Sequence, residues 1–417
     1  MNGTSTGDNG TSTGDDAKDI LLAKASTGAR IKALRIKHGL TQRGLADRAH
    51  VSYSLLTKVE SGARPASADL VAACARALGT SEELLAGRYR TVTGDDRLLS
   101  LMAPIRAALD LFDLPPNEDV RPRPLRDLTA SVKQVNRLAQ AARYEPMAAT
   151  LPGLLQELHT ATHYFSGSEQ QTVWALLAEA ARCGHSVGIA LGLNDLSVVA
   201  LQTMDWAAAR AGDQGVGLRA VREYLRVTAY LRIRDYETCW RLNAAGLAHL
   251  DGTDDRTPGA LVARGQLHLG ASIIAAYTGD QDLMLEHLAQ ADLIASRTGE
   301  QTEQFWLGFG PTNVAVHRVM ALGAAGEHGQ AVDAAEGLRF PRGWLPTRVG
   351  HHYLDLARAL RWMNRPDQAL EALLAAREAA PGQARRHPLA RDTITGLVRS
   401  VRRRSDVLAE YAAWVGV

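Results

Sequence analysis

The chain reads LTQRGLADRAHVSYSLLTKVESGARP from Leu40 to Pro65, and this stretch predicts two short helices joined by a tight turn. Thr41 can cap the first helix and Ser52 the second, because an N-cap hydroxyl accepts a hydrogen bond from an unpaired N–H of the first turn. Gly62 follows the point where the second helix must end, since glycine takes a positive φ at the least cost. Such a pair of helices can place its second member in the major groove of DNA.

Apolar residues at helical spacing surround this stretch and could close a small core of five helices. They are Leu34, Leu40, Leu45, Ala46, Val51, Leu55 or Leu56, Val59, Leu70 and Leu78. Between Arg30 and Arg64 stand eight basic residues against two acidic ones, whereas the whole chain carries a net charge of only +2. Positive charge is therefore concentrated where a phosphate backbone would lie.

The stretch resembles the XRE (lambda-repressor/Cro-like) helix-turn-helix family almost position by position. The resemblance implies that one group of side chains faces base edges, namely Tyr53, Ser54, Thr57 and Lys58. It implies phosphate contacts from a second group, Arg43, Ser61 and Arg64. Gln42 opens the first helix of the pair, where it can bind a phosphate and buttress the second helix. Leu56 and Val59 should face inward, and Glu60 is expected to be a structural hydrogen-bonding residue rather than a base reader.

Two residues depart from the family pattern. His50 stands where the family usually has glycine in the turn, so we expect a non-glycine residue at positive φ, at a cost of about 1 kcal/mol. Gly44 replaces the usual Glu or Arg and should loosen its helix by about 0.5–1 kcal/mol. Neither departure forbids the fold.

Composition predicts an all-α protein, because 46% of the 417 residues are hydrophobic, Ala and Leu are abundant, and alternating β-branched patterns are nearly absent. Residues 1–25 contain the tract NGTSTGD twice and no large apolar cluster, so a disordered tail is expected there. The sequence shows no signal peptide and no apolar run long enough to span a membrane. We therefore expect a cytoplasmic, nucleoid-associated protein.

The spacing of the cysteines and histidines and the excess of arginine give little information about function. Cys74, Cys183 and Cys239 share no close spacing, which favours neither a disulfide framework nor a zinc site. His159 and His163 lie four apart, but no third ligand follows at a useful spacing, and no metal is expected. Of the 47 basic residues 41 are Arg, which indicates a GC-rich genome rather than a mechanism.

The sequence predicts a helix-turn-helix domain at residues 26–90, a helical linker with proline breaks at 91–150, and a repeat array at 151–417. In the array, apolar helices end at small or polar corners and a second helix follows. Arg234, Gly279, Gly326 and Arg365 mark equivalent corners, separated by 45, 47 and 39 residues. These spacings exceed the tetratricopeptide period of about 34 residues. Stacked helix pairs of this kind predict an α-solenoid with a concave face.

The whole chain from about residue 28 resembles regulators in which an XRE helix-turn-helix is fused to a tetratricopeptide-like domain, especially those of GC-rich filamentous bacteria. The segments at residues 144–159 and 309–318 carry the second part of this likeness. The resemblance implies a homodimer that binds double-stranded DNA and a peptide or small-molecule effector. A scaffold that only holds a dimer together is the alternative for the array.

Asn313 is the best candidate for an effector contact, because an amide offers both a donor and an acceptor to a peptide backbone. Its neighbours in the sequence complete the candidate set, namely Phe309, Trp306, His317 and Arg318. Each could instead be a core aromatic or a satisfied buried polar group. Phe309-Gly310-Pro311 predicts a helix irregularity beside this set.

Three functions remain open on sequence alone. The first is an effector-modulated DNA-binding regulator, and the second is a protein-interaction adaptor whose helix-turn-helix does not read DNA. The third is an enzyme with a helical regulatory domain. The sequence carries no phosphate-binding loop, nucleophile elbow or metalloprotease motif, so neither catalytic residues nor a cofactor are expected.

Overall fold

The computed structural model describes residues 26–78, 85, 95–110, 114–251, 257–400 and 405–417. The tail expected at 1–25 lies outside these residues, as do residues 91–94 and 111–113 of the linker expected at 91–150. Within the described residues the chain is all-α, with one isolated antiparallel bridge between Gln301 and Phe309. It divides into two compact units, Met1–Asp96 and Arg97–Val417.

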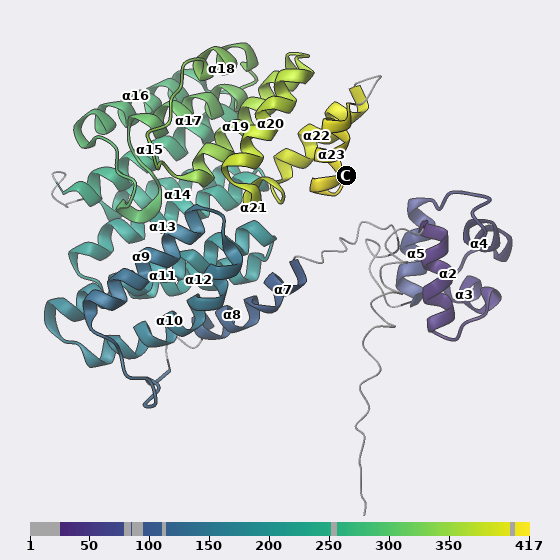
Figure 1. The fold of residues 1–417 in the computed structure, drawn as a ribbon, viewed down its shortest axis with the longest axis horizontal. Helices are drawn as coiled ribbons and strands as arrows, with labels where there is room; N and C mark the ends of the chain where they lie inside the picture. Colours follow the sequence, from purple (N-terminus) through teal and green to yellow (C-terminus); the bar gives the residue numbers. More distant parts are fainter. Residues whose placement is uncertain (1–25, 79–84, 86–94, 111–113, 252–256, 401–404) are drawn as a thin grey trace, which may run out of the picture. The chain divides into compact units, whose positions relative to one another are not determined.

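The first unit contains the predicted helix pair. Its described helices are α2 (Thr27–Lys37), α3 (Gln42–Ala49), α4 (Tyr53–Glu60) and α5 (Ala68–Leu78), which Figure 1 shows as a small bundle. Ile31, Leu45 and Leu56 are fully buried at its centre. A Cβ on Gly28 would lie 1.9 Å from the carbonyl oxygen of Val59, so only glycine allows α2 to pass this close to the end of α4.

Local signals in the sequence set the boundaries of α3 and α4. The Gly44 N–H donates to the Thr41 hydroxyl at 3.0 Å, and the Leu55 N–H donates to the Ser52 hydroxyl at 3.2 Å. Both predicted N-caps are therefore confirmed. His50 ends α3 in the left-handed region with φ 55° and ψ 42°, so the expected positive φ at a non-glycine residue is also confirmed.

The second unit is an array of paired helices. In chain order its helices are α8 (Met102–Asp110), α9 (Leu125–Gln140), α10 (Tyr144–Tyr164), α11 (Gly167–Leu191), α12 (Asn194–Ala208), α13 (Asp213–Arg232), α14 (Tyr236–His249), α15 (Pro258–Thr278), α16 (Gln281–Thr298), η1 (Gln304–Trp306), α17 (Pro311–Ala324), α18 (His328–Ala335), α19 (Pro346–Trp362), α20 (Pro366–Ala379), α21 (Pro381–Ala384), α22 (Pro388–Ser400) and α23 (Asp406–Val415). The short helix α7 (Asp95–Ser100) crosses the boundary between the units.

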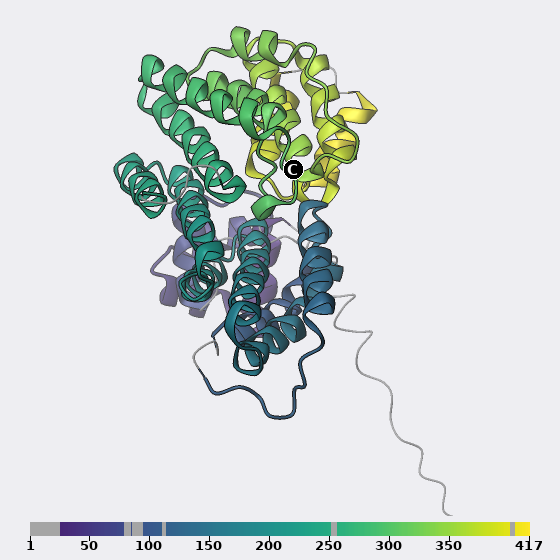
Figure 2. The ribbon, with the colours of Figure 1, turned by 90° about the vertical axis from the view of Figure 1, so that its left-hand side faces the viewer.

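The pairs α11–α12, α13–α14, α15–α16, α17–α18 and α19–α20 stack in chain order, as Figures 1 and 2 show. The predicted corners fall between helices of a pair. Arg234 has φ 59°, Gly279 has φ 80° and Gly326 has φ 86°, while Arg365 is the N-cap of α20. The solenoid-like array is therefore confirmed. Helices α8 and α9 pack on α10–α12, so the proline-containing segment belongs to the same core.

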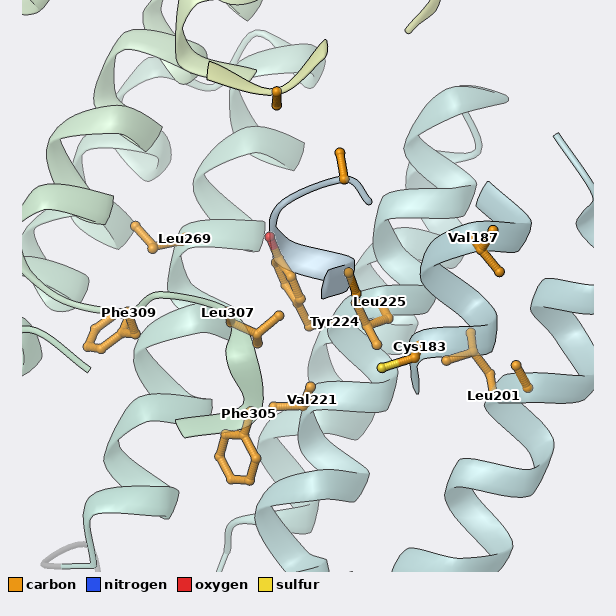
Figure 3. Packing of buried hydrophobic residues seen from close by; sticks show 14 of the residues in the cluster. Cys183, Val187, Leu201, Val221, Tyr224, Leu225, Leu269, Phe305, Leu307 and Phe309 are labelled. Atoms are coloured by element: carbon orange, nitrogen blue, oxygen red, sulfur yellow. The ribbon is translucent and has the colours of Figure 1, made fainter. Parts of the chain in front are cut away.

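An irregular segment at residues 300–310 joins α16 to α17 and lies within the array. Its apolar side chains are buried, and two of them fit against glycines of neighbouring helices. A Cβ on Gly217 would lie 2.5 Å from the Phe305 ring, and one on Gly265 would lie 2.1 Å from the Phe309 ring. Figure 3 shows Phe305, Leu307 and Phe309 packed among the inner helices. Phe305 and Trp306 have φ 53° and 55°, so tight packing holds a strained backbone here.

None of the helices in the described residues is both long enough and apolar enough to cross a membrane.

Candidate nucleic-acid interface

Helix α4 presents a polar face to solvent and an apolar face to the core. Tyr53 has 48% of its surface exposed, Ser54 and Lys58 are also exposed, and Thr57 is half-buried. Leu56 is fully buried and Val59 is 2% exposed on the other side of the helix. The structure therefore brings the four side chains proposed to read bases onto the accessible face of one helix.

Several neighbouring contacts order this face. The Arg43 guanidinium lies 5.6 Å from the centre of the Tyr53 ring, a distance that suits a cation–π interaction. The Thr57 hydroxyl donates to the Tyr53 carbonyl at 2.9 Å, and the Ser61 hydroxyl donates to the Lys58 carbonyl at 3.1 Å. Both hydroxyls keep lone pairs with which they can accept hydrogen bonds.

The end of α4 is tied to α2 and α3 through Glu60. Arg35 Nε donates to Glu60 Oε1 at 2.8 Å, and Arg35 Nη2 donates to Oε2 at 2.9 Å. Gln42 Nε2 donates to the same Oε2 at 2.9 Å. Glu60 is thus the structural hydrogen-bonding residue expected from the sequence, and Gln42 buttresses α4 from the start of α3.

Sequence reasoning missed the role of Arg35, which was counted among the basic residues available to phosphate. Its side chain is only 10% exposed and its charge is matched by Glu60. Removing this pair from the count takes away one base and one acid, so the excess of positive charge on the unit is unchanged. Arg43, Arg48, Lys58 and Arg64 are exposed.

The proposed effector residues of the second unit separate into two places. Asn313 is fully buried, and its Nδ2 donates to Gln266 Oε1 at 3.3 Å. His317 is 2% exposed with Nδ1 2.9 Å from the Asn313 carbonyl oxygen, and burial lowers its pKa to about 3. Phe309 fills the space beside Gly265, and Arg318 is half-buried.

Trp306 lies elsewhere, in the wall of a cavity of about 240 Å³. Its indole Nε1 donates to a carboxylate oxygen of Glu179 at 3.2 Å. Burial raises the pKa of the Glu179 carboxyl. The structure thus joins Asn313 to His317 in one buried polar contact, and it places Trp306 in a separate one with Glu179 at the cavity wall.

Residues 27–86 match the family described as a helix-turn-helix domain. The first unit of the chain is therefore a helix-turn-helix domain. The propionyl-CoA carboxylase regulator of Cereibacter sphaeroides is 34% identical over 98 residues, which are 24% of this chain and 20% of that protein. The chain thus aligns with about a fifth of the length of this curated relative.

Two solved structures align with most of the chain. Bacillus thuringiensis PlcR, in complex with the peptide PapR7 and DNA, covers 85% of this chain and 94% of its own, at 14% identity and a TM-score of 0.29. The PrgX/iCF10 complex covers 93% of this chain and 95% of its own, at 11% identity and a TM-score of 0.27.

Proposed function

We propose that the chain is a sequence-specific DNA-binding transcriptional regulator. The observation that carries this proposal is the geometry of α4, an N-capped helix with an exposed polar face whose end is fixed by Glu60. Tyr53, Ser54, Thr57 and Lys58 would contact base edges, and Arg43, Ser61 and Arg64 would contact phosphates. The match to a helix-turn-helix family and the regulator named among its relatives support this assignment.

In this proposal the second unit regulates the binding of DNA by the first. A homodimer would present two copies of α4 about 34 Å apart on successive turns of the major groove. An effector or partner that binds one arrangement of the helical array better than another would shift the population toward that arrangement. DNA binding would then depend on what the array has bound.

A protein-interaction adaptor is the second candidate, because Tyr53 is largely exposed and Leu55 is half-buried, which makes α4 less polar than a typical reading helix. Salt dependence separates the two functions. The regulator requires that the logarithm of the DNA affinity fall linearly with the logarithm of salt concentration, with a slope of about −0.9 for each phosphate neutralised. Fluorescence anisotropy with genomic fragments measures this slope. A weak DNA affinity that does not change with salt concentration favours the adaptor.

A further inference from the structure

The second unit contains the cavity of about 240 Å³ that Trp306 lines, and this cavity is open to solvent. Six stretches of chain supply its wall, at residues 139–144, 182–190, 224–232, 306–307, 347–351 and 383–388. Figure 3 shows one side of this region, where Tyr224 and Leu225 lie between Leu307 and Cys183. The cavity therefore gathers residues from nearly the whole length of the array.

The first and the last of these six stretches lie in contact. A Cβ on Gly382 would lie 2.3 Å from the carbonyl oxygen of Ala142, so the turn after α9 touches α21. Gln140 extends this contact, because its Oε1 accepts from the Thr347 hydroxyl at 2.8 Å and its Nε2 donates to the Trp306 carbonyl. A ligand in the cavity would thus touch helices from both ends of the unit.

The wall of the cavity is strongly cationic. Four arginines line it, Arg182, Arg232, Arg348 and Arg386, and no Asp or Glu is among the lining residues. Arg348 is held against the wall by a hydrogen bond from its Nε to the Leu307 carbonyl at 3.2 Å. Guanidinium groups bind carboxylates and phosphates through paired N–H donors, so this wall suits an oxyanion.

Two acidic side chains lie near the cavity but outside its lining. Glu179 bonds to Trp306, and Asp355 lies 3.5 Å from His351 and 3.4 Å from Arg358. Burial raises the pKa of both carboxyls, that of Asp355 to about 6. Within the part of the chain that the structure describes, neither Arg182 nor Arg348 forms a salt bridge with a carboxylate.

Arg182 is the most deeply buried of the four arginines. It is 2% exposed, and it donates from Nη2 to Asn136 Oδ1. Its Nε has no hydrogen-bond partner among the residues that the structure describes. Burying a cation is expensive unless an opposite charge or further hydrogen bonds compensate it. Burial lowers the pKa of Arg182, and the opposing effects of Cys183 and Glu179 are smaller than that of burial.

Neutral donors complete the wall. Three histidines face the arginines, His185, His351 and His387. Burial and the nearby arginine charges lower the pKa of all three, that of His185 to about 3. Uncharged imidazoles and the hydroxyls of Tyr144 and Tyr224 can donate hydrogen bonds to a ligand without adding repulsion. The hydroxyls of Thr228 and Thr347 already donate, to the Leu225 carbonyl and to Gln140 Oε1.

We propose that this cavity binds a small organic oxyanion that carries a phosphate or several carboxylates, with Arg182, Arg232 and Arg348 as its charge partners. The volume lies just below the range of about 300–1,000 Å³ typical of ligand pockets, which suits a metabolite better than an extended peptide. Binding would stabilise the contact between helices from both ends of the array. That such binding alters DNA affinity rests on the proposed function, whereas the binding itself does not.

Calorimetric titration of the full chain without DNA tests the proposal. The probes are inorganic pyrophosphate, citrate and adenosine monophosphate, with adenosine as the uncharged control. Arg232→Gln and Arg348→Gln each remove one charge from the wall. Arg234→Gln is the matched control, because Arg234 follows the same helix α13, is exposed and lies outside the cavity lining.

At least one charged probe should bind the wild type and Arg234→Gln equally, and bind each cavity variant at least tenfold more weakly. Preference for pyrophosphate and adenosine monophosphate over citrate identifies a phosphate ligand, and the reverse identifies a polycarboxylate. The proposal is overturned if no charged probe binds, or if adenosine binds as well as its phosphate. Equal affinity in Arg232→Gln, an exposed position that leaves the core intact, also overturns it.

Discussion

Arg35 and Glu60, 25 residues apart in the chain, form a two-pronged buried ion pair with N–O distances of 2.8 and 2.9 Å. The pair joins α2 to the last residue of α4. Arg35 also donates from Nη1 to the Leu40 carbonyl at 2.7 Å, so the loop before α3 is held by the same guanidinium. The orientation of the proposed reading helix is therefore set from inside the unit, by residues that do not reach DNA.

Glu60→Gln should destabilise the first unit by about 3–5 kcal/mol, because it leaves the Arg35 charge buried without its partner. Hydrogen exchange of the α4 amides measures this loss locally, which avoids a two-state treatment of a chain with two units. Asp47→Asn is the control, since Asp47 is exposed and its change should stay within about 0.5 kcal/mol. Equal protection of α4 in both variants would contradict the role given to Glu60.

His50→Gly should stabilise the first unit by about 1 kcal/mol, because His50 occupies the left-handed region at φ 55°. Gly62→Ala should have the opposite effect by a similar amount, since Gly62 has φ 79°. No atom lies within 4 Å of a Cβ at Gly62, so the second change tests backbone strain without a clash. Urea unfolding, monitored by hydrogen exchange of the α4 amides, should show that the two substitutions change the free energy of unfolding with opposite signs. Changes of the same sign would refute this explanation.

Gly265→Ala should destabilise the second unit by about 1–3 kcal/mol, because the added methyl would occupy the place of the Phe309 ring. Gly153→Ala is the control within an exposed helix position, with nothing within 4 Å of the new Cβ. It should stabilise its helix by about 0.5–1 kcal/mol. Thermal unfolding of the two variants compares these effects, and a neutral Gly265→Ala would show that the segment at 300–310 is loosely packed.

Acidification should destabilise the second unit. Burial lowers the pKa of His185 and His317 to about 3 and that of His352 to about 4. Between those values and the unfolded pKa near 6.5 the unfolded chain binds more protons, so stability is full above pH 6.5 and falls as the pH drops. From pH 7 to 5 each histidine removes about 2 kcal/mol, and Asp355, with its pKa raised to about 6, offsets part of this total.

Urea midpoints at pH 7 and pH 5 measure this loss. His317→Gln should reduce the dependence on pH, whereas His163→Gln should not, because His163 is exposed. A midpoint that is unchanged or higher at pH 5 would show that these histidines are not held neutral by the fold.

Local patterns in the sequence predicted the first unit well. The hydroxyls of Thr41 and Ser52 act within three residues of their partners, and the strain at His50 belongs to a single turn. Such signals can be read without knowing the tertiary structure. The Arg35–Glu60 pair could not be read in this way, because it depends on how α2 crosses α4, and only the space left by Gly28 allows that crossing.

The cavity of the second unit could not be predicted from the sequence. The abundance of arginine was attributed to a GC-rich genome, and nothing in the spacing of Arg182, Arg232 and Arg348 sets them apart from the others. They lie together because α11, α13 and α19, which belong to separate pairs, converge on the cavity. This convergence depends on the curvature of the array and not on any one helix. Of the five predicted effector residues, only Trp306 lines this cavity.

Capture of genomic DNA fragments by the purified full chain, at two salt concentrations and beside Lys58→Ala, tests the central claim most directly. Lys58 is exposed on α4, and the loss of its proposed base contact should weaken binding to specific sites by about 1–3 kcal/mol. The account predicts a few strongly enriched fragments whose capture falls with salt and is largely lost in the variant. Fragments captured equally by both proteins, or enrichment no better than background with and without pyrophosphate, would contradict the claim that α4 reads DNA.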